Sequence, residues 1–251
     1  MSNPMAEPGT RAIIVEAARA HAFDLYLSAL LAPASARDDL IVLAAFEGEI
    51  DRIPHVVSEP LLADIRLQWW RDVIASAGKA DGTGNPIADA LADVIARRGL
   101  DGDGLIVSID ARAPRDAAAE ATPAGQRLLA TDAAAMHRAL RVLQATPAGG
   151  NDAAFLDAAG LAVTEAREAM STEGNDAAAA AAAMRARGHL EHARSLAGKS
   201  RRDLRLSALP VALVEPYLRA WEKARRSRGQ AMIVPIARVW RLWWFARIGR
   251  M

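Results

Sequence analysis

The sequence predicts an all-α protein. Alanine, leucine, arginine and glutamate, which favour helices, are abundant throughout the 251 residues. Alternating runs of β-branched and polar residues, which would indicate strands, are almost absent. The chain is 52% hydrophobic, enough to bury a sizeable core. We therefore expect one helical domain that covers residues 1–251.

Prolines and charged residues delimit the first expected helices. Pro33 should end the first helix, and Asp38 and Asp39 suit the first turn of the second, where negative charge interacts favourably with the helix dipole. Pro54 should stop the second helix, and Pro60 suits the first turn of the third. Gly-rich and polar stretches at 77–86, 145–152 and 171–176 predict loops between later helices. The expected helices are 11–31, 37–53, 59–77, 86–98, 101–112, 117–145, 152–170, 176–197, 207–227 and 233–248.

Composition excludes several classes of function. The net charge of +1 gives no strong field toward nucleic acid, so we expect no nucleic-acid partner. The absence of cysteine excludes disulfides, thiolate catalysis and Cys-ligated metal. The first residues lack a basic region followed by an apolar run, and no run of about 18 apolar residues exists, so we expect neither a secretory signal nor a membrane span. These observations favour a cytoplasmic protein, and peripheral attachment to the inner membrane stays open.

Two neighbouring helices carry matching apolar stripes. In the helix at 37–53, the positions that share one face are Val42, Phe46, Ile50 and Ile53. In the helix at 59–77 they are Leu62, Ile65, Trp69 and Val73. Packing of the two stripes would give an αα-hairpin.

At these residues the chain resembles the squalene/phytoene synthase family. The stretch "YLSALLAPASARDDLIVLAAFEGEIDRI" (26–53) is similar to the segment in which the family carries Ala-Phe shortly before an Asp-rich motif. The stretch "VSEPLLADIRLQWWRDVI" (57–74) is similar to one branch, the phytoene synthase-like proteins that include a mitochondrial complex I assembly factor. The resemblance implies an isoprenoid-synthase-like helical bundle around a central cavity, and an activity that joins two prenyl diphosphates with the help of magnesium.

The chain departs from the family at its acidic motifs. Where the enzymes have an Asp-Asp-x-x-Asp motif, this sequence reads Asp51-Arg52-Ile53-Pro54-His55, so one aspartate of three remains. The second motif should lie at 152–170, where Glu165 and Glu168 are the acids beyond the entry turns. Magnesium requires several oxygen ligands, and Arg52 would repel it. We therefore expect no metal site and no cofactor, with magnesium implied only if the chain is an enzyme; Asp51 is the one weak catalytic candidate.

Other residues of the hairpin are candidates for a pocket or for a structural role. By the helical wheel, Glu49 faces inward beside Phe46, so it needs a partner, for which Arg66 and Arg71 on the next helix are the candidates. A salt bridge that fixes the hairpin and a polar group in a pocket both remain open for Glu49. The full candidate set is Phe46, Glu49, Arg66, Gln68, Trp69 and Trp70.

The C-terminal run "PIARVWRLWWFARIGR" (235–250) predicts an amphipathic helix. Trp240 and Trp243 share one face with Ile236 and Val239, and Trp244 lies at its edge. The arginines Arg238 and Arg241 lie on the other side. Tryptophan and arginine on such a helix suit a membrane interface, for which the candidates are Trp240, Arg241, Trp243 and Trp244. The alternative is a last core helix whose tryptophans line the central cavity.

The preferred hypothesis is a diverged, non-catalytic member of the family. It would bind an isoprenoid or other lipid, or a partner protein such as a respiratory-complex subunit or assembly protein, at a membrane surface. Biogenesis of a membrane respiratory complex is implied by the resemblance alone. An active prenyltransferase with a non-standard set of acids, and a plain helical interaction module without a ligand, remain the alternatives.

Overall fold

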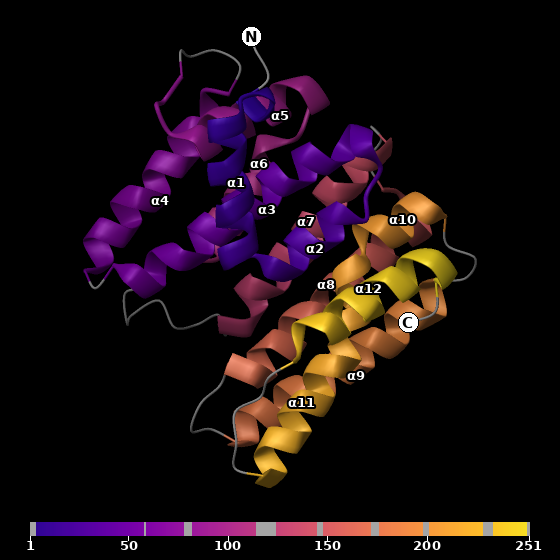
Figure 1. The fold of residues 1–251 in the computed structure, drawn as a ribbon. Helices are drawn as coiled ribbons and strands as arrows, with labels where there is room; N and C mark the ends of the chain where they lie inside the picture. The colour runs from indigo at the N-terminus through magenta and orange to yellow at the C-terminus, as the bar shows by residue number, and fades with distance from the viewer. Residues whose placement is uncertain are drawn as a thin grey trace. The chain divides into compact units, whose positions relative to one another are not determined.

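The computed structural model describes residues 4–57, 59–77, 82–113, 124–144, 148–171, 176–197, 201–227 and 233–249; for 124–130 only the backbone is described. Every regular element in these ranges is a helix, which confirms the all-α prediction (Figure 1). The chain forms two compact units. Unit 1 comprises Met1–Pro123 and Arg141–Ala145, and unit 2 comprises Ala124–Leu140 and Thr146–Met251. The expectation of one domain over 1–251 and that of a central cavity both stay predictions.

Unit 1 is built around one long helix. Its elements are η1 (Pro4–Ala6), α1 (Pro8–His21), α2 (Phe23–Leu30), α3 (Ala34–Val56), α4 (Pro60–Ala75), α5 (Pro86–Arg98) and α6 (Gly102–Asp110). Helices α1, α2, α4 and α5 all pack against α3. Every residue from Ile41 to Gly48 is buried, so neighbours surround this part of α3.

The first expected helix, 11–31, is in fact two helices, because the chain breaks at Ala22 between α1 and α2. Gly48 of α3 lies directly beneath this break. A Cβ at Gly48 would lie 2.8 Å from His21 Cβ and 3.3 Å from the Ala22 nitrogen. Glycine therefore allows α3 to approach the break closely, which no stripe of apolar residues in the sequence could indicate.

The expectation that Pro54 stops the second helix is also wrong, since α3 continues to Val56 with Pro54 inside it. A proline in the last turn forfeits one backbone bond, and Val57 still donates to the Ile53 carbonyl at 3.2 Å. The later bounds agree to within a few residues for α5 and α6. Part of the helix expected at 117–145, residues 117–123, lies outside the described residues.

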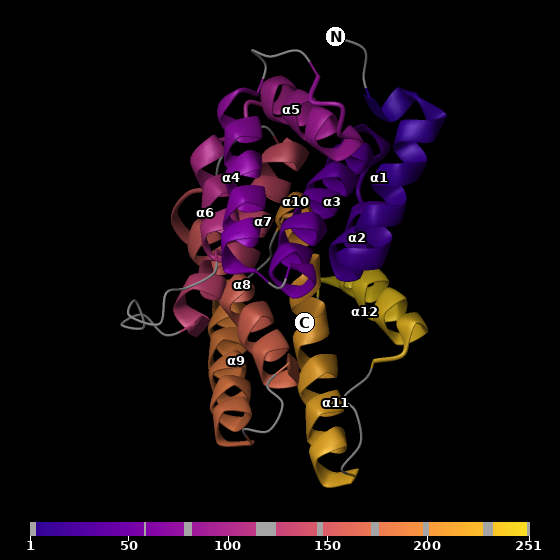
Figure 2. The same ribbon diagram turned by 90° about the vertical axis from the view of Figure 1, so that its left-hand side faces the viewer.

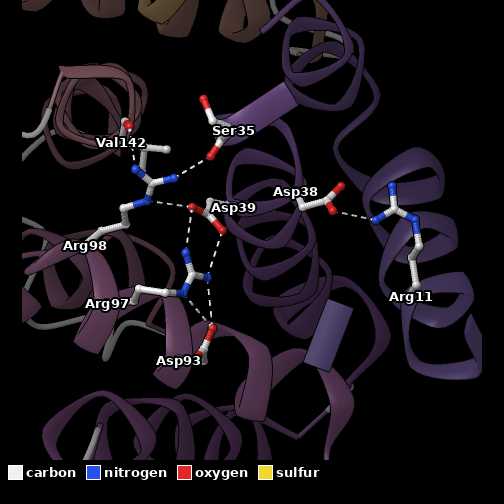
Figure 3. A network of polar contacts seen from close by, with 8 residues as sticks. All are labelled: Arg11, Ser35, Asp38, Asp39, Asp93, Arg97, Arg98 and Val142. Carbon is white, nitrogen blue, oxygen red and sulfur yellow. Dashed lines mark hydrogen bonds and ion pairs between the residues drawn. The ribbon is translucent and has the colours of Figure 1, made fainter. Parts of the chain in front are cut away.

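A network around Asp39 joins three segments of unit 1 (Figure 3). Its buried carboxylate accepts two hydrogen bonds from Arg97, at 3.1 and 2.9 Å, and one from Arg98 at 2.7 Å. Arg98 also donates to the carbonyls of Ser35 and Val142, and Arg97 pairs with Asp93. Charge-assisted bonds of this kind are the strong ones, so Asp39 fixes α3 against α5, and Arg98 extends the network to the Val142 carbonyl.

Unit 2 contains α7 (Ala124–Gln144) up to Leu140, together with α8 (Gly150–Ser171), α9 (Asp176–Ala197), α10 (Arg202–Ser207), η3 (Leu209–Leu213), α11 (Val214–Ser227) and α12 (Pro235–Ile248). Helices α8 and α9 form an extensive helical hairpin, and α11 packs on α8 (Figure 2). Helix α12 rests on η3 and α10. The helix expected at 207–227 is η3 followed by α11, and α10 ends at Ser207, because Pro210 lies where a continuous helix would need a backbone donor.

Candidate functional site

An arginine lies between Asp51, the remaining aspartate of the first candidate motif, and Glu47, an acid that the sequence analysis did not single out. Glu47 and Asp51 are one turn apart on α3, so their side chains point the same way. Arg112, in the turn after α6, places Nη2 3.3 Å from Glu47 Oε2 and Nε 3.1 Å from Asp51 Oδ1. Its Nη1 also donates to the Ser108 carbonyl at 2.8 Å. The guanidinium therefore takes the place at which a cation bound by both carboxylates would have to lie.

Burial differs among the three members of this Glu47–Arg112–Asp51 cluster. The side chains of Glu47 and Arg112 are 6% and 11% exposed, whereas that of Asp51 is 55% exposed. A buried charge needs a partner, and Glu47 and Arg112 supply each other with one. Asp51, the weak catalytic candidate, is thus an outer ion-pair partner of Arg112.

The prediction that Glu49 pairs with an arginine of the next helix is wrong. Glu49 pairs with Arg52 on its own helix, with 3.1 Å between Oε2 and Nη2, and not with Arg66 or Arg71. Arg66 is exposed on α4, and Arg71 pairs with Asp110 at 2.6 Å. The buried acid is Glu47, which the helical wheel missed because α3 is buried around nearly its whole circumference and not along one stripe.

Some of the aromatic candidates lie in the hydrophobic core, and others lie at the surface. Phe46 is fully buried and packs edge-on against buried Trp70, with ring centroids 5.3 Å apart. Trp69 packs edge-on against Trp70 but is 38% exposed itself. Gln68 is exposed and donates to Asp72 at 2.8 Å. Of the hairpin candidates, Phe46 and Trp70 are therefore core residues.

The predicted stripe of α4 has the wrong phase. Of its four members, Val73 is buried, but Leu62, Ile65 and Trp69 are exposed. The buried positions are Ala63, Leu67, Trp70, Val73 and Ile74. Both faces of this helix carry large apolar side chains, so periodicity alone could not decide which face packs inward.

Glu165 of the second acidic region and Asp132 of α7 are also bound to arginines. Buried Glu165 of α8 accepts two bonds from Arg185 of α9, at 2.7 and 2.8 Å. Buried Asp132 of α7 accepts from Arg167 at 2.7 Å and from Thr164 at 2.9 Å. Asp132 was missed by sequence analysis because it lies in a helix that the family motif does not mark.

The membrane candidates on α12 face outward. Trp240 is 60% exposed, and Trp243 and Trp244 are each 40% exposed, whereas Leu242 and Phe245 on the opposite side are buried. Arg241 is half-buried and lies 3.3 Å from Glu215 of α11. The alternative in which these tryptophans line a core cavity does not match their exposure.

No group of three or more His, Cys, Asp or Glu side chains in the described part of the chain could hold a metal ion. Within the same ranges, no helix combines the length and the apolar character that crossing a bilayer requires.

Known proteins are similar to this chain in fold and in the sequence of unit 1. Residues 18–116 match the squalene/phytoene synthase family. The whole fold resembles the crystal structure of squalene synthase HpnC from Alicyclobacillus acidocaldarius, with a TM-score of 0.67 and 16% identity over 91% of this chain and 100% of that one. The predicted resemblance and the isoprenoid-synthase-like helical fold are thereby confirmed.

Two mammalian relatives match a shorter segment. NADH dehydrogenase (ubiquinone) complex I, assembly factor 6 is 30% identical in Bos taurus and 28% identical in Homo sapiens, in each case over 104 residues. The match covers 41% of this chain and 31% of each relative, so the chain aligns with about a third of their length.

Proposed function

We propose that this chain, whose residues 18–116 match the squalene/phytoene synthase family, is a diverged member without prenyltransferase activity. It would act as a lipid- or partner-binding factor in the biogenesis of a membrane respiratory complex. The main support for the proposed lack of prenyltransferase activity is the position of Arg112 between Glu47 and Asp51.

The chemistry of prenyl transfer explains why that arginine matters. A leaving diphosphate needs magnesium, and magnesium is held by carboxylate oxygens. Here Glu47 and Asp51 are both paired with the guanidinium of Arg112, whose positive charge lies where a metal cation would be needed. Glu165 and Asp132 are each bonded to an arginine too. The acids of the described residues, as they are paired here, do not fit a magnesium site.

The role in complex biogenesis is supported by the relatives. Both mammalian proteins are named as complex I assembly factors, and each matches this chain over 104 residues. The squalene synthase fold supports a lipid-like ligand, since that neighbour is named for a reaction on isoprenoids. A cytoplasmic chain attached to the face of the inner membrane belongs to the same proposal.

A second candidate function is an active prenyltransferase with a non-standard set of acids. The observation in its favour is that the fold matches a squalene synthase over the full length of that enzyme. Its candidate ligands would be the buried acids Glu165 and Asp132. Both would first have to exchange an arginine for a metal ion.

Genetic complementation tests the proposed role. Removal of the gene from its native organism should lower the amount of assembled NADH dehydrogenase on native gels and the NADH oxidation rate of the membranes. The wild-type chain and Asp51→Ala should restore both equally, because Asp51 has no catalytic task. Normal assembly in the deletion strain would overturn the biogenesis role. Failure of a folded Asp51→Ala chain to restore it would overturn the non-catalytic part.

A further inference from the structure

Helix α12 presents a continuous outward apolar face. Its members recur at helical spacing and are all exposed: Ile236, Val239, Trp240, Trp243, Trp244 and Ile248. Trp240 stacks on both Trp243 and Trp244, with centroids 5.6 and 5.9 Å apart and ring planes within 27° of each other. We call these six residues the α12 face. Large apolar patches of this kind, rimmed by polar groups, mark interaction sites.

The stretch of sequence that contains the α12 face carries charge of one sign. From Lys223 to Met251 the sequence contains no Asp or Glu. The basic residues in this stretch are Lys223, Arg225, Arg226, Arg228, Arg238, Arg241, Arg247 and Arg250. Arg247 lies over the ring of Trp243, with its guanidinium carbon 5.7 Å from the ring centroid. The segment that contains the face is therefore cationic within a protein whose overall charge is close to zero.

A cluster of arginines lies beside the face. Glu215 of α11 pairs with Arg219 at 3.0 Å, with Arg241 of α12 at 3.3 Å and with Arg194 of α9. Three guanidinium groups thus meet one carboxylate, so these four side chains sum to a charge of +2. The hydrogen bond from Arg194, and then the three positive charges, lower the pKa of Glu215. Arg219 remains 72% exposed, open to a further anion.

We infer that α12 docks on an anionic phospholipid surface, with its tryptophans in the interfacial layer and Arg219, Arg241 and Arg247 against lipid phosphates. The indole ring has an apolar body and one N–H donor, which suits the layer between headgroups and acyl chains. Guanidinium groups match the geometry of phosphate oxygens. The docking surface deepens the membrane part of the proposed function and rests on it.

The charge pattern favours a bilayer over a partner protein as the occupant. A protein helix packed on the α12 face would need a dense acidic border of its own to match the basic stretch, whereas anionic headgroups supply that charge over any area. Two signals together, apolar insertion and basic charge, are also what reversible membrane attachment requires. The apolar side chains on α4 have acids beside them, Asp64 and Asp72, and lack this pattern.

Vesicle flotation of the full chain tests the inference. The wild-type chain should float with vesicles of phosphatidylcholine and phosphatidylglycerol and bind pure phosphatidylcholine at least about tenfold more weakly. The triple variant Trp240→Ala/Trp243→Ala/Trp244→Ala and the single variant Arg219→Glu should each lose about tenfold or more in binding to the mixed vesicles. The matched control is Leu61→Ala/Ile65→Ala, which removes apolar side chains from α4 that are 70% and 56% exposed, and it should bind as the wild type does.

A second readout needs no variant. Lipids brominated just below the headgroup should quench tryptophan emission of the wild-type chain more strongly than lipids brominated at the chain end. Inorganic phosphate should not compete with vesicles, which separates a lipid surface from a free phosphate ion. No flotation of the wild-type chain, or equal flotation of the folded tryptophan variant, would overturn the inference. A chain that floats but fails in complementation would instead count against the biogenesis role alone.

Discussion

Replacement of Asp39 by alanine is expected to lower the free energy of unfolding by about 3 kcal/mol. The carboxylate of Asp39 is buried and accepts from both Arg97 and Arg98 (Figure 3). Loss of one partner from a buried pair leaves the other charges without compensation, which is where the large cost arises. Arg97 keeps Asp93 and is partly exposed, so we place the cost at the lower end of the usual range. Hydrogen bonding to Asp39 is also the first cause of the raised pKa of Arg97.

Asp38 provides the matched control for this substitution. It is the neighbouring aspartate on the same helix and pairs with Arg11 at 2.7 Å, but both side chains are well exposed. Asp38→Ala should therefore change the free energy of unfolding by less than about 1 kcal/mol. Urea denaturation of the two variants and the wild type measures the difference. Equal stability of Asp39→Ala and Asp38→Ala would show that the Asp39 network does not hold unit 1 together.

Replacement of Glu47 by alanine is expected to cost about 2 kcal/mol, more than Glu49→Ala, which should stay within about 0.5 kcal/mol. Glu47 is buried against the equally buried Arg112, whereas Glu49 forms a partly exposed pair with Arg52. Arg112 keeps Asp51 and the Ser108 carbonyl, which limits the cost for Glu47. Glu47→Gln should cost less than Glu47→Ala, because the amide still accepts a hydrogen bond.

Thermal or urea melts of the three variants show whether Glu47 or Glu49 contributes more to the free energy of unfolding. The same experiment tests the geometry on which the functional proposal depends. If Glu49→Ala were the more damaging change, the side chain of Glu49 would be the buried one, and Arg112 would not have the place between Glu47 and Asp51 described above.

The sequence was sufficient for the features that depend on local pattern. The stripe of Val42, Phe46, Ile50 and Ile53 is buried as expected, since every face of α3 near its centre packs inward. The amphipathic character of the C-terminal helix, Pro235–Ile248, follows directly from spacing. The two stretches that resemble the squalene/phytoene synthase family, 26–53 and 57–74, both lie within residues 18–116, which match that family.

Features that depend on contacts between distant residues could not be predicted. The place of Arg112 beside Glu47 joins residues 65 positions apart, and no motif marks it. The phase of α4 was wrong because Leu62 and Ile65 are as apolar as the residues that pack inward. The close approach of Gly48 to the break at Ala22 is a tertiary contact, which the local pattern does not mark. In each case the local pattern permits two arrangements, and packing selects one.

The most direct test of the non-catalytic proposal is release of diphosphate from farnesyl or geranylgeranyl diphosphate by the full chain in the presence of magnesium. The position of Arg112 between Glu47 and Asp51 predicts no release above a chain-free control, for the wild type and for Asp51→Ala alike. Magnesium-dependent release by the wild-type chain that disappears in Asp51→Ala would contradict the proposal and establish the prenyltransferase alternative.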